Sequence, residues 1–202
     1  MATTPVFISL PDPVTSGEAP LETLLQQRRS VREYQEAALE LSAIGQLLWA
    51  AQGITDPQGL RTAPSAGALY PLELYVVAGN VDGLAPGVYH YHPGRHRLQQ
   101  TRPDDLRHLL ARAAHGQSWV RTAAAVVVVT AVYDRTTRKY GERGIRYVHM
   151  EVGHAAQNLF LQAEALGLAA VVVGAFEDDA VATTLGLPTD AQPLMLIPVA
   201  RK

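Results

Sequence analysis

Apolar residues recur along this chain with two spacings, one typical of helices and one typical of strands. Between Ser42 and Gly53 they return every three or four positions, which predicts an amphipathic helix capped by Ser42 and ended by Gly53. The same spacing predicts a long helix over residues 147–166, closed by Gly167, and shorter helices over 21–27, 103–113 and 178–185. Apolar runs rich in Val and Leu predict strands over residues 72–78, 88–91, 97–99, 124–132, 168–173 and 194–200.

The order of these elements indicates the fold class. The predicted strands within residues 72–99 follow one another with turn signals such as Pro93-Gly94, which favours antiparallel pairing. Helices precede, interrupt and follow the strands, so the economical arrangement places helices on both faces of a mixed sheet. We therefore predict an α+β fold.

Chain length and composition are those of one globular domain. The chain has 202 residues, of which 48% are hydrophobic and 18% are charged, so it can bury a substantial core. Residues 1–20 are rich in Pro, Thr and Ser, which predicts an irregular N-terminal arm. We predict a single domain over residues 21–202.

Charge and hydropathy argue against nucleic acid and membranes as partners. A formal net charge of −2 provides no basic excess for either surface. The longest apolar run, residues 123–132, is about half the length of a membrane-spanning helix, and the first residues lack a signal-peptide pattern. We therefore expect a cytoplasmic protein.

Cysteine and histidine usage restricts the chemistry. The chain contains no cysteine, which excludes disulfides, thiolate nucleophiles, iron–sulfur clusters and cysteine-ligated zinc. Glu151 and His154 form one Glu-x-x-His pair, whereas a carboxylate di-iron site uses two. We expect no metal site, so redox chemistry would need a bound cofactor.

The first candidate binding motif is a dense basic group formed by Arg28, Arg29, Ser30 and Arg32. Three guanidiniums within five residues, with a hydroxyl between them, can surround a dianionic phosphate with planar donors that stay charged at any working pH. Taken alone, the same residues would more often be the solvated basic end of a helix.

A second motif, formed by Pro64, Ser65, Ala66 and Gly67, precedes the strand predicted over residues 72–78. A Ser-Ala-Gly turn allows a flat ligand to approach the backbone closely. Without further information, this 64–67 loop could also be a plain connection between a helix and a strand.

A third motif begins with Lys139 and Tyr140 and continues as Gly-Glu-Arg-Gly. Alone, a Lys-Tyr pair is usually an exposed loop. As a base either group would need help, because both ionise near pH ~10 when free and a base works best near the operating pH. A desolvated lysine, or a tyrosinate stabilised by that lysine, would provide this help.

Together these motifs resemble the FMN-dependent nitroreductase superfamily, and within it the SagB-type dehydrogenases. The resemblance spans residues 21–202 and implies a three-layer α/β/α fold with a mixed, mainly antiparallel sheet. It also implies FMN bound non-covalently at the interface of a homodimer. By motif position, it assigns the FMN phosphate and ribityl chain chiefly to Arg28, Ser30 and Arg32, with Arg29 beside them and Arg201 as a second basic group.

The same resemblance implies the remaining contacts of the flavin. The 64–67 loop would touch the flavin of the other protomer, and the backbone of Val172, Val173 and Gly174 would face the flavin N5 edge. Lys139 and Tyr140 would serve azoline oxidation, in which a base removes a carbon-bound proton while a hydride passes to the flavin.

We therefore predict an FMN-dependent oxidoreductase that oxidises a small molecule or a heterocycle in a modified peptide. One alternative is an NAD(P)H-dependent nitro or quinone reductase, and another is a non-catalytic flavin-binding subunit of a larger complex. Neither a Gly-x-Gly-x-x-Gly nor a Walker A motif is present, so the signatures of Rossmann and P-loop nucleotide sites are missing.

Overall fold

A seven-stranded antiparallel sheet forms the middle layer of the protein. The computed structural model describes residues 5–202, and the sheet has the strand order β1-β6-β5-β3-β7-β9-β8. The strands are β1 (Phe7–Ser9), β3 (Leu72–Ala78), β5 (Gly87–His92), β6 (Arg97–Arg102), β7 (Ala125–Val132), β8 (Leu168–Ala170) and β9 (Ala191–Arg201). The predicted mainly antiparallel pairing is confirmed, and the parallel pair of β2 (Leu39–Glu40) with β4 (Val81–Asp82) lies outside the seven-stranded sheet.

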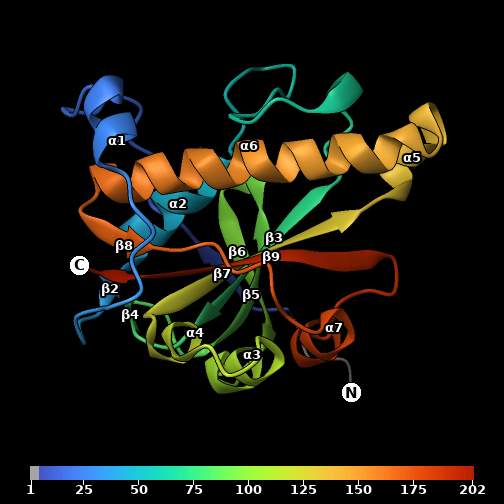
Figure 1. The fold of residues 1–202 in the computed structure, drawn as a ribbon. Helices are drawn as coiled ribbons and strands as arrows, with labels where there is room; N and C mark the ends of the chain where they lie inside the picture. Colours follow the sequence, from blue (N-terminus) through green and yellow to red (C-terminus); the bar gives the residue numbers. More distant parts are fainter. Residues whose placement is uncertain (1–4) are drawn as a thin grey trace.

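Helices cover both faces of this sheet and complete three layers (Figure 1). Helices α2 (Leu41–Gln52) and α6 (Arg143–Ala165) lie on one face, and α3 (Arg107–Ala113), α4 (Ser118–Thr122) and α7 (Asp178–Leu185) lie on the other. Helices α1 (Leu21–Gln27) and α5 (Asp134–Tyr140) lie near opposite ends of α6, and two short 3₁₀ turns are η1 (Ala66–Ala68) and η2 (Pro93–Arg95). The predicted α+β, three-layer fold is confirmed.

The position of the central strands between two layers of helices explains why their sequences are continuously apolar. In β7, Val127 and Val129 pack in the core cluster that includes α2 and α6, whereas Val126 and Val128 pack in the cluster with α3 and α4. Because both faces of the strand are covered, both sets of alternate side chains must be apolar. No helix within residues 5–202 is both long and apolar enough to cross a membrane.

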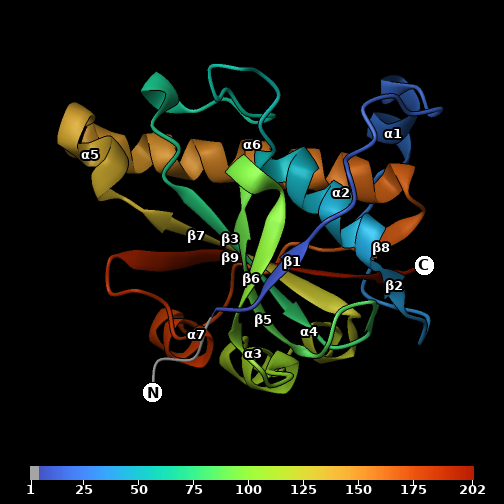
Figure 2. The same ribbon diagram turned by 180° about the vertical axis from the view of Figure 1, so that it is seen from behind.

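The predicted N-terminal arm contains a strand that its composition does not reveal. Strand β1 pairs with β6 through Ile8 and Leu98, and the following Leu10 is buried. Figure 2 shows this segment leaving the sheet edge, passing α2 and reaching α1. An edge strand of three residues is too short to show an alternating pattern. Residues 1–4 of the predicted arm lie outside the described part of the chain.

Helix boundaries differ from the expectation at four places. Helix α3 begins at Arg107 rather than at residue 103, because residues 103–106 are not helical. Helix α2 begins at Leu41, so Ser42 lies inside it, because the short strand β2 leads the chain directly into the first turn. Gly53 follows α2 with a φ of −63°, so it is not a left-handed cap, whereas Gly167 after α6 has a φ of 66°. Helix α6 begins at Arg143, four residues before the predicted start, because α5 packs against its first turn.

Candidate functional site

Backbone pairing brings the arginine motif next to the C-terminal strand. Arg28 ends α1, and the chain then runs past β8 and β9, where the Val31 N–H donates to the Ala170 carbonyl at 3.0 Å. The Gln35 N–H donates to the Arg201 carbonyl at 3.2 Å. The arginine motif and Arg201, which come from the two ends of the sequence, therefore lie at the same end of the sheet. Both were predicted to bind one anion.

The guanidiniums of this group differ in their contacts. Arg28 lies over the Phe160 ring at 5.7 Å, and Arg32 lies over the Trp119 ring at 5.5 Å. Arg29 turns back to its own segment and donates to the Arg28 carbonyl at 2.7 Å, whereas Arg201 lies 3.8 Å from the carboxylate of Glu40. Within residues 5–202, neither Arg28 nor Arg32 forms an ion pair, so their charge is available to an anion.

Ser65 closes the 64–67 loop into a tight turn. Its hydroxyl accepts a hydrogen bond from the Tyr70 N–H at 2.9 Å, and its carbonyl accepts one from the Ala68 N–H at 3.0 Å. Gly67, Ala68 and Tyr70 have φ values of 65°, 53° and 46°. A left-handed backbone at two non-glycine residues is strained, so the turn depends on these hydrogen bonds.

Lys139 and Tyr140, at the end of α5, meet this turn at Gly67. A β-carbon on Gly67 would lie 2.8 Å from the Tyr140 hydroxyl and 3.0 Å from the Lys139 ammonium. The ammonium lies 5.3 Å from the centre of the Tyr140 ring, and that ring meets Tyr147 of α6 edge-on at 5.2 Å. The structure therefore brings the second and third sequence motifs into direct contact.

The arginine group and the Lys-Tyr pair lie toward opposite ends of α6 (Figure 1). Arg28 contacts Phe160, and Tyr140 contacts Tyr147. These two α6 residues are 13 positions apart, which corresponds to about 20 Å on a helix that rises about 1.5 Å per residue. A single chain thus does not bring its own predicted phosphate group and its own predicted catalytic pair together.

The 172–174 segment continues from β8 alongside the neighbouring strand β9. The Val173 N–H and carbonyl pair with Leu196 of β9 at 2.8 and 3.0 Å, and its side chain is buried. Val172 is 38% exposed, and a β-carbon on Gly174 would meet nothing within 4 Å. The segment therefore presents open backbone at Gly174, as the close approach of a ligand requires.

The sequence does not predict the partly buried ionic network that lies next to the turn. Arg135 of α5 donates to the Tyr70 carbonyl at 3.0 Å and pairs with Glu73, whose other oxygen lies 2.7 Å from His90. Burial would raise the pKa of Glu73, but His90 and Arg135 hold it below its usual value. The available signal was an acidic residue within the apolar strand β3.

Glu151 is a further residue of this region that the sequence did not point to. It is buried on α6 near the 64–67 loop, and burial raises its pKa to about 7 against the opposing effects of the Ser65 hydroxyl and the Arg61 guanidinium.

Further along α6, the Asn158 amide donates to the Thr62 carbonyl at 3.2 Å. Within residues 5–202, no group of three or more metal-ligating side chains forms a metal site.

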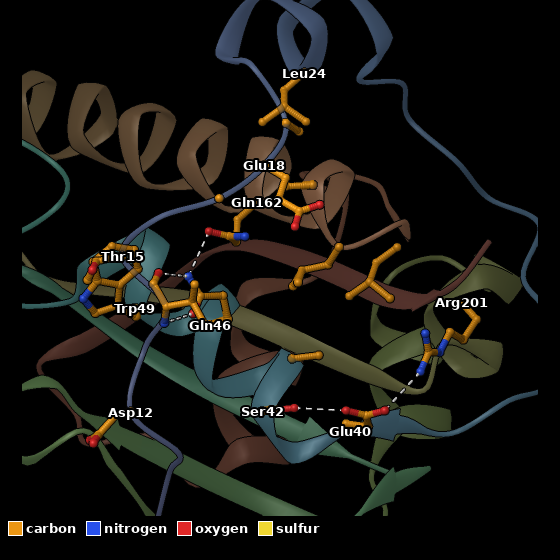
Figure 3. A pocket seen from close by; sticks show the side chains of 17 residues that line it. Asp12, Thr15, Glu18, Leu24, Glu40, Ser42, Gln46, Trp49, Gln162 and Arg201 are labelled. Atoms are coloured by element: carbon orange, nitrogen blue, oxygen red, sulfur yellow. Dashed lines mark hydrogen bonds and ion pairs between the residues drawn. The ribbon is translucent and has the colours of Figure 1, made fainter.

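A cavity of about 740 Å³ lies away from the Lys-Tyr pair, between the N-terminal segment, α2 and the end of α6 (Figure 3). The Gln46 amide binds both backbone groups of Val14 and also donates to Gln162 at 3.0 Å. Arg201 and Glu40 line the same cavity, so its wall adjoins the arginine group.

Sequence comparisons with known proteins agree on one family. The model of the nitroreductase family matches residues 25–201. The nitroreductase candidate MJ1384 of Methanocaldococcus jannaschii is 48% identical over 195 residues, which cover 96% of each chain. The microcin B17-processing protein McbC of Escherichia coli is 31% identical over 155 residues, which cover 74% of this chain and 57% of McbC.

Solved structures give the same result. A nitroreductase candidate of Ralstonia eutropha JMP134 is 32% identical and superposes with a TM-score of 0.85, covering 96% of this chain and 89% of that one. A chain of the E. coli microcin synthetase complex McbBCD, solved with truncated pro-MccB17 bound, is 25% identical with a TM-score of 0.74, covering 96% and 77%.

Proposed function

The chain belongs to the nitroreductase family, and on this basis we propose that it is an FMN-dependent oxidoreductase. Within the family we propose that it acts in the manner of the SagB-type dehydrogenases and oxidises a small molecule or an azoline heterocycle in a modified peptide. The observation that carries this choice is the contact of Lys139 and Tyr140 with Gly67.

The residues present suit the phosphate of FMN. Arg28 and Arg32 flank Ser30 on the segment whose backbone pairs with β8 and β9, and neither forms an ion pair within residues 5–202. Arg28 lies over Phe160 and Arg32 over Trp119, on opposite faces of the sheet, so both would have to turn toward one phosphate. A dianionic phosphate is the ligand that such planar donors bind most strongly. Arg29 donates to its own helix end and would add charge rather than a contact. Arg201 would have to exchange Glu40 for the phosphate.

The Lys-Tyr pair suits the transfer of a proton. When bound, FMN would supply the hydride acceptor of the reaction. One member of the Lys139–Tyr140 pair would remove the carbon-bound proton of the substrate, supported by the other, since the Lys139 nitrogen lies 5.3 Å from the centre of the Tyr140 ring. The turn at Gly67 would hold both groups in position, since its missing β-carbon leaves room for them. The name of McbC, a peptide-processing relative, supports a peptide substrate.

A homodimer would complete each site. The predicted phosphate group and the predicted catalytic pair of one chain lie about 20 Å apart along α6, so a second, antiparallel copy could place its own pair beside the first chain's arginines. The exposed side of α6 carries Met150, which is 51% exposed, Ile145 at 43%, and Gly153, whose missing side chain permits close packing. We propose that this side of α6 is the dimer interface.

The first experiment tests the direction of electron flow. The FMN-loaded protein is mixed anaerobically with NADH and then NADPH while the absorbance of the oxidised flavin is followed. We expect the flavin to stay oxidised with both and to bleach with an azoline-containing peptide. Rapid bleaching by either nicotinamide would instead favour the nitro or quinone reductase.

The second experiment tests the catalytic pair. Lys139→Met and Tyr140→Phe should each abolish substrate-dependent flavin reduction, because each removes the proton acceptor or its support. Arg138→Ala is the matched control, since Arg138 is an exposed neighbour that pairs with Asp134 at 3.5 Å. Turnover that survives the loss of both Lys139 and Tyr140 would contradict the assignment. A flavin that binds but reacts with no donor would favour a non-catalytic flavin-binding subunit of a larger complex.

A further inference from the structure

Glu73 is a charged residue in the central strand β3, whose other residues are all buried. Its side chain is only 19% exposed. Burial would raise its pKa, but His90 and Arg135 hold that pKa below its usual value, so the carboxylate is ionised at neutral pH. A carboxylate in such a place lowers stability unless partners compensate its charge, so the role of Glu73 depends on what those partners do.

The first partner, Arg135 of α5, contacts two separate segments with one guanidinium. Its Nη2 atom pairs with Oε1 of Glu73, and its Nη1 atom donates to the Tyr70 carbonyl at 3.0 Å. Tyr70 is left-handed, with a φ of 46°, and its N–H donates to the Ser65 hydroxyl at 2.9 Å. Arg135 therefore connects β3, α5 and the end of the turn formed by residues 65–70.

The same side of α5 carries a member of the predicted catalytic pair. Lys139 follows Arg135 by four positions, so the two side chains lie one above the other on the helix. Arg135 meets the 65–70 turn at Tyr70, whereas Lys139 and Tyr140 meet it at Gly67, where a β-carbon would lie within 3.0 Å of both. The contact of Arg135 is thus the neighbouring attachment of α5 to this turn.

The second partner, His90, holds the carboxylate of Glu73 in place. The His90 Nε2 atom lies 2.7 Å from Oε2 of Glu73, which leaves Oε1 to Arg135. The His90 ring stacks on Tyr75 with 4.7 Å between ring centres, and His92 meets its edge at 4.6 Å. Because both oxygens are engaged and the imidazole is packed, Glu73 offers Arg135 an acceptor with a fixed position.

We infer that Glu73 is a positioning residue, which holds the Arg135 guanidinium against the 65–70 turn so that α5 presents Lys139 and Tyr140 at Gly67. This inference rests on the proposed function of the Lys-Tyr pair. Without the carboxylate, Arg135 loses its second contact, and its 40% exposed side chain can turn to solvent. The pair then loses its fixed place at the turn.

The first test measures the position of the pair by NMR, using the full chain without added FMN. The wild-type protein should show a nuclear Overhauser effect between the Gly67 α-protons and the Tyr140 ring, because a β-carbon on Gly67 would lie 3.5 Å from a carbon of that ring. Glu73→Gln and Arg135→Met should each abolish it, while the amide signals of the buried strand β7 keep their dispersion.

Arg138→Met is the matched control, because Arg138 lies on the same helix, is 81% exposed and pairs with Asp134. This variant should keep the Overhauser effect. An effect that is missing in the wild type, or that survives both Glu73→Gln and Arg135→Met, would overturn the inference. Arg135→Met, at a half-exposed site, decides the question even if Glu73→Gln fails to fold.

The second test measures the limiting rate of flavin reduction per bound FMN at saturating azoline-containing peptide. Glu73→Gln and Arg135→Met should each lower this rate by about 10- to 100-fold, as a displacement of reacting groups does, and the double variant should be no slower than Arg135→Met alone. A purely structural role would lower the melting temperature but leave the rate per bound flavin unchanged. Loss of the Overhauser effect with an unchanged rate would support the positioning and contradict the proposed function of the pair instead.

Discussion

At the scale of single residues, Gly67 combines two independent requirements for glycine. Its φ is 65°, and a β-carbon would lie 2.8 Å from the Tyr140 hydroxyl. The first requirement affects backbone energy, and the second affects the position of the catalytic candidates. A comparison with Gly59, whose φ is 86° and whose surroundings are open within 4 Å, can separate them.

Gly67→Ala and Gly59→Ala should both destabilise the protein by about 1–2 kcal/mol, because each places a β-carbon on a left-handed residue. Only Gly67→Ala should also displace Lys139 and Tyr140 and slow flavin reduction by the substrate. Denaturant unfolding and anaerobic flavin reduction measure the two effects. Equal activity of the two variants would show that the close contact has no catalytic role.

Arg28→Ala and Arg32→Ala should each weaken FMN binding by roughly 1.5–3 kcal/mol, because each removes a charge-assisted hydrogen bond to the phosphate. This corresponds to a rise in Kd of about 10- to 150-fold, measured by quenching of flavin fluorescence. Arg112→Ala, which removes an exposed arginine from α3, is the control and should leave the Kd unchanged. An unchanged Kd in both motif variants would contradict the placement.

At the scale of elements, the N-terminal segment shows where composition alone misleads. Its Pro- and Thr-rich sequence predicts an irregular arm, yet β1 extends the sheet and the next residues lie along α2. The Gln46 amide supplies this attachment, since its oxygen accepts the Val14 N–H at 2.8 Å and its nitrogen donates to the Val14 carbonyl at 3.0 Å. No local pattern in residues 5–20 predicts a contact with Gln46, which lies 32 positions after Val14.

Gln46→Ala should therefore lower the free energy of unfolding by about 1–3 kcal/mol, because it removes two partly buried hydrogen bonds to the Val14 backbone, each contributing about 0.5–1.5 kcal/mol. It should also expose residues 10–20 to limited proteolysis. Gln58→Ala, in an exposed loop, is the control and should change neither measurement. A protease pattern identical to that of the wild type would show that Gln46 does not hold the segment.

At the scale of the whole molecule, the two halves of the predicted site lie toward opposite ends of α6, which leads to the proposed dimer. Met150→Glu should dissociate this dimer, because it places a charge in an apolar interface, and light scattering should detect monomers. FMN binding should fall in parallel. Val6→Glu, which changes a 53% exposed apolar residue outside α6, should leave a dimer. A dimeric Met150→Glu variant would exclude this side of α6 as the interface.

Stability should depend on pH through Glu151. Its pKa rises from 4.5 to about 7 on folding, so the native state binds the proton more tightly and stability falls as pH increases between these values. The Glu151→Gln variant has no ionisable group at this position, so its stability should not fall over this pH range. The variant should match the wild type near pH 4 and exceed it by about 3 kcal/mol near pH 8, as measured by urea unfolding. A difference between variant and wild type that does not change with pH would contradict the burial effect.

Much of the fold could be derived from the chain because its signals are local. Helical periodicity locates α2, α6 and α7, and β-branched runs locate β3 and β7, since each pattern reports the burial of one element face. The motifs around Arg28, Gly67 and Lys139 also identify the family, which the comparisons confirm.

Only the tertiary structure decided which of these local features meet. It placed Arg201 beside the arginine motif, brought Tyr140 to Gly67, and buried Glu151 beneath the same turn. Each contact joins residues far apart in sequence, and each depends on how strands pair and helices pack over the whole sheet. Local periodicity does not predict which strands pair or which helices pack together. The amino-acid sequence by itself therefore determined most of the elements, the family and the candidate chemistry, whereas packing determined that one chain separates the arginine group from the predicted catalytic pair.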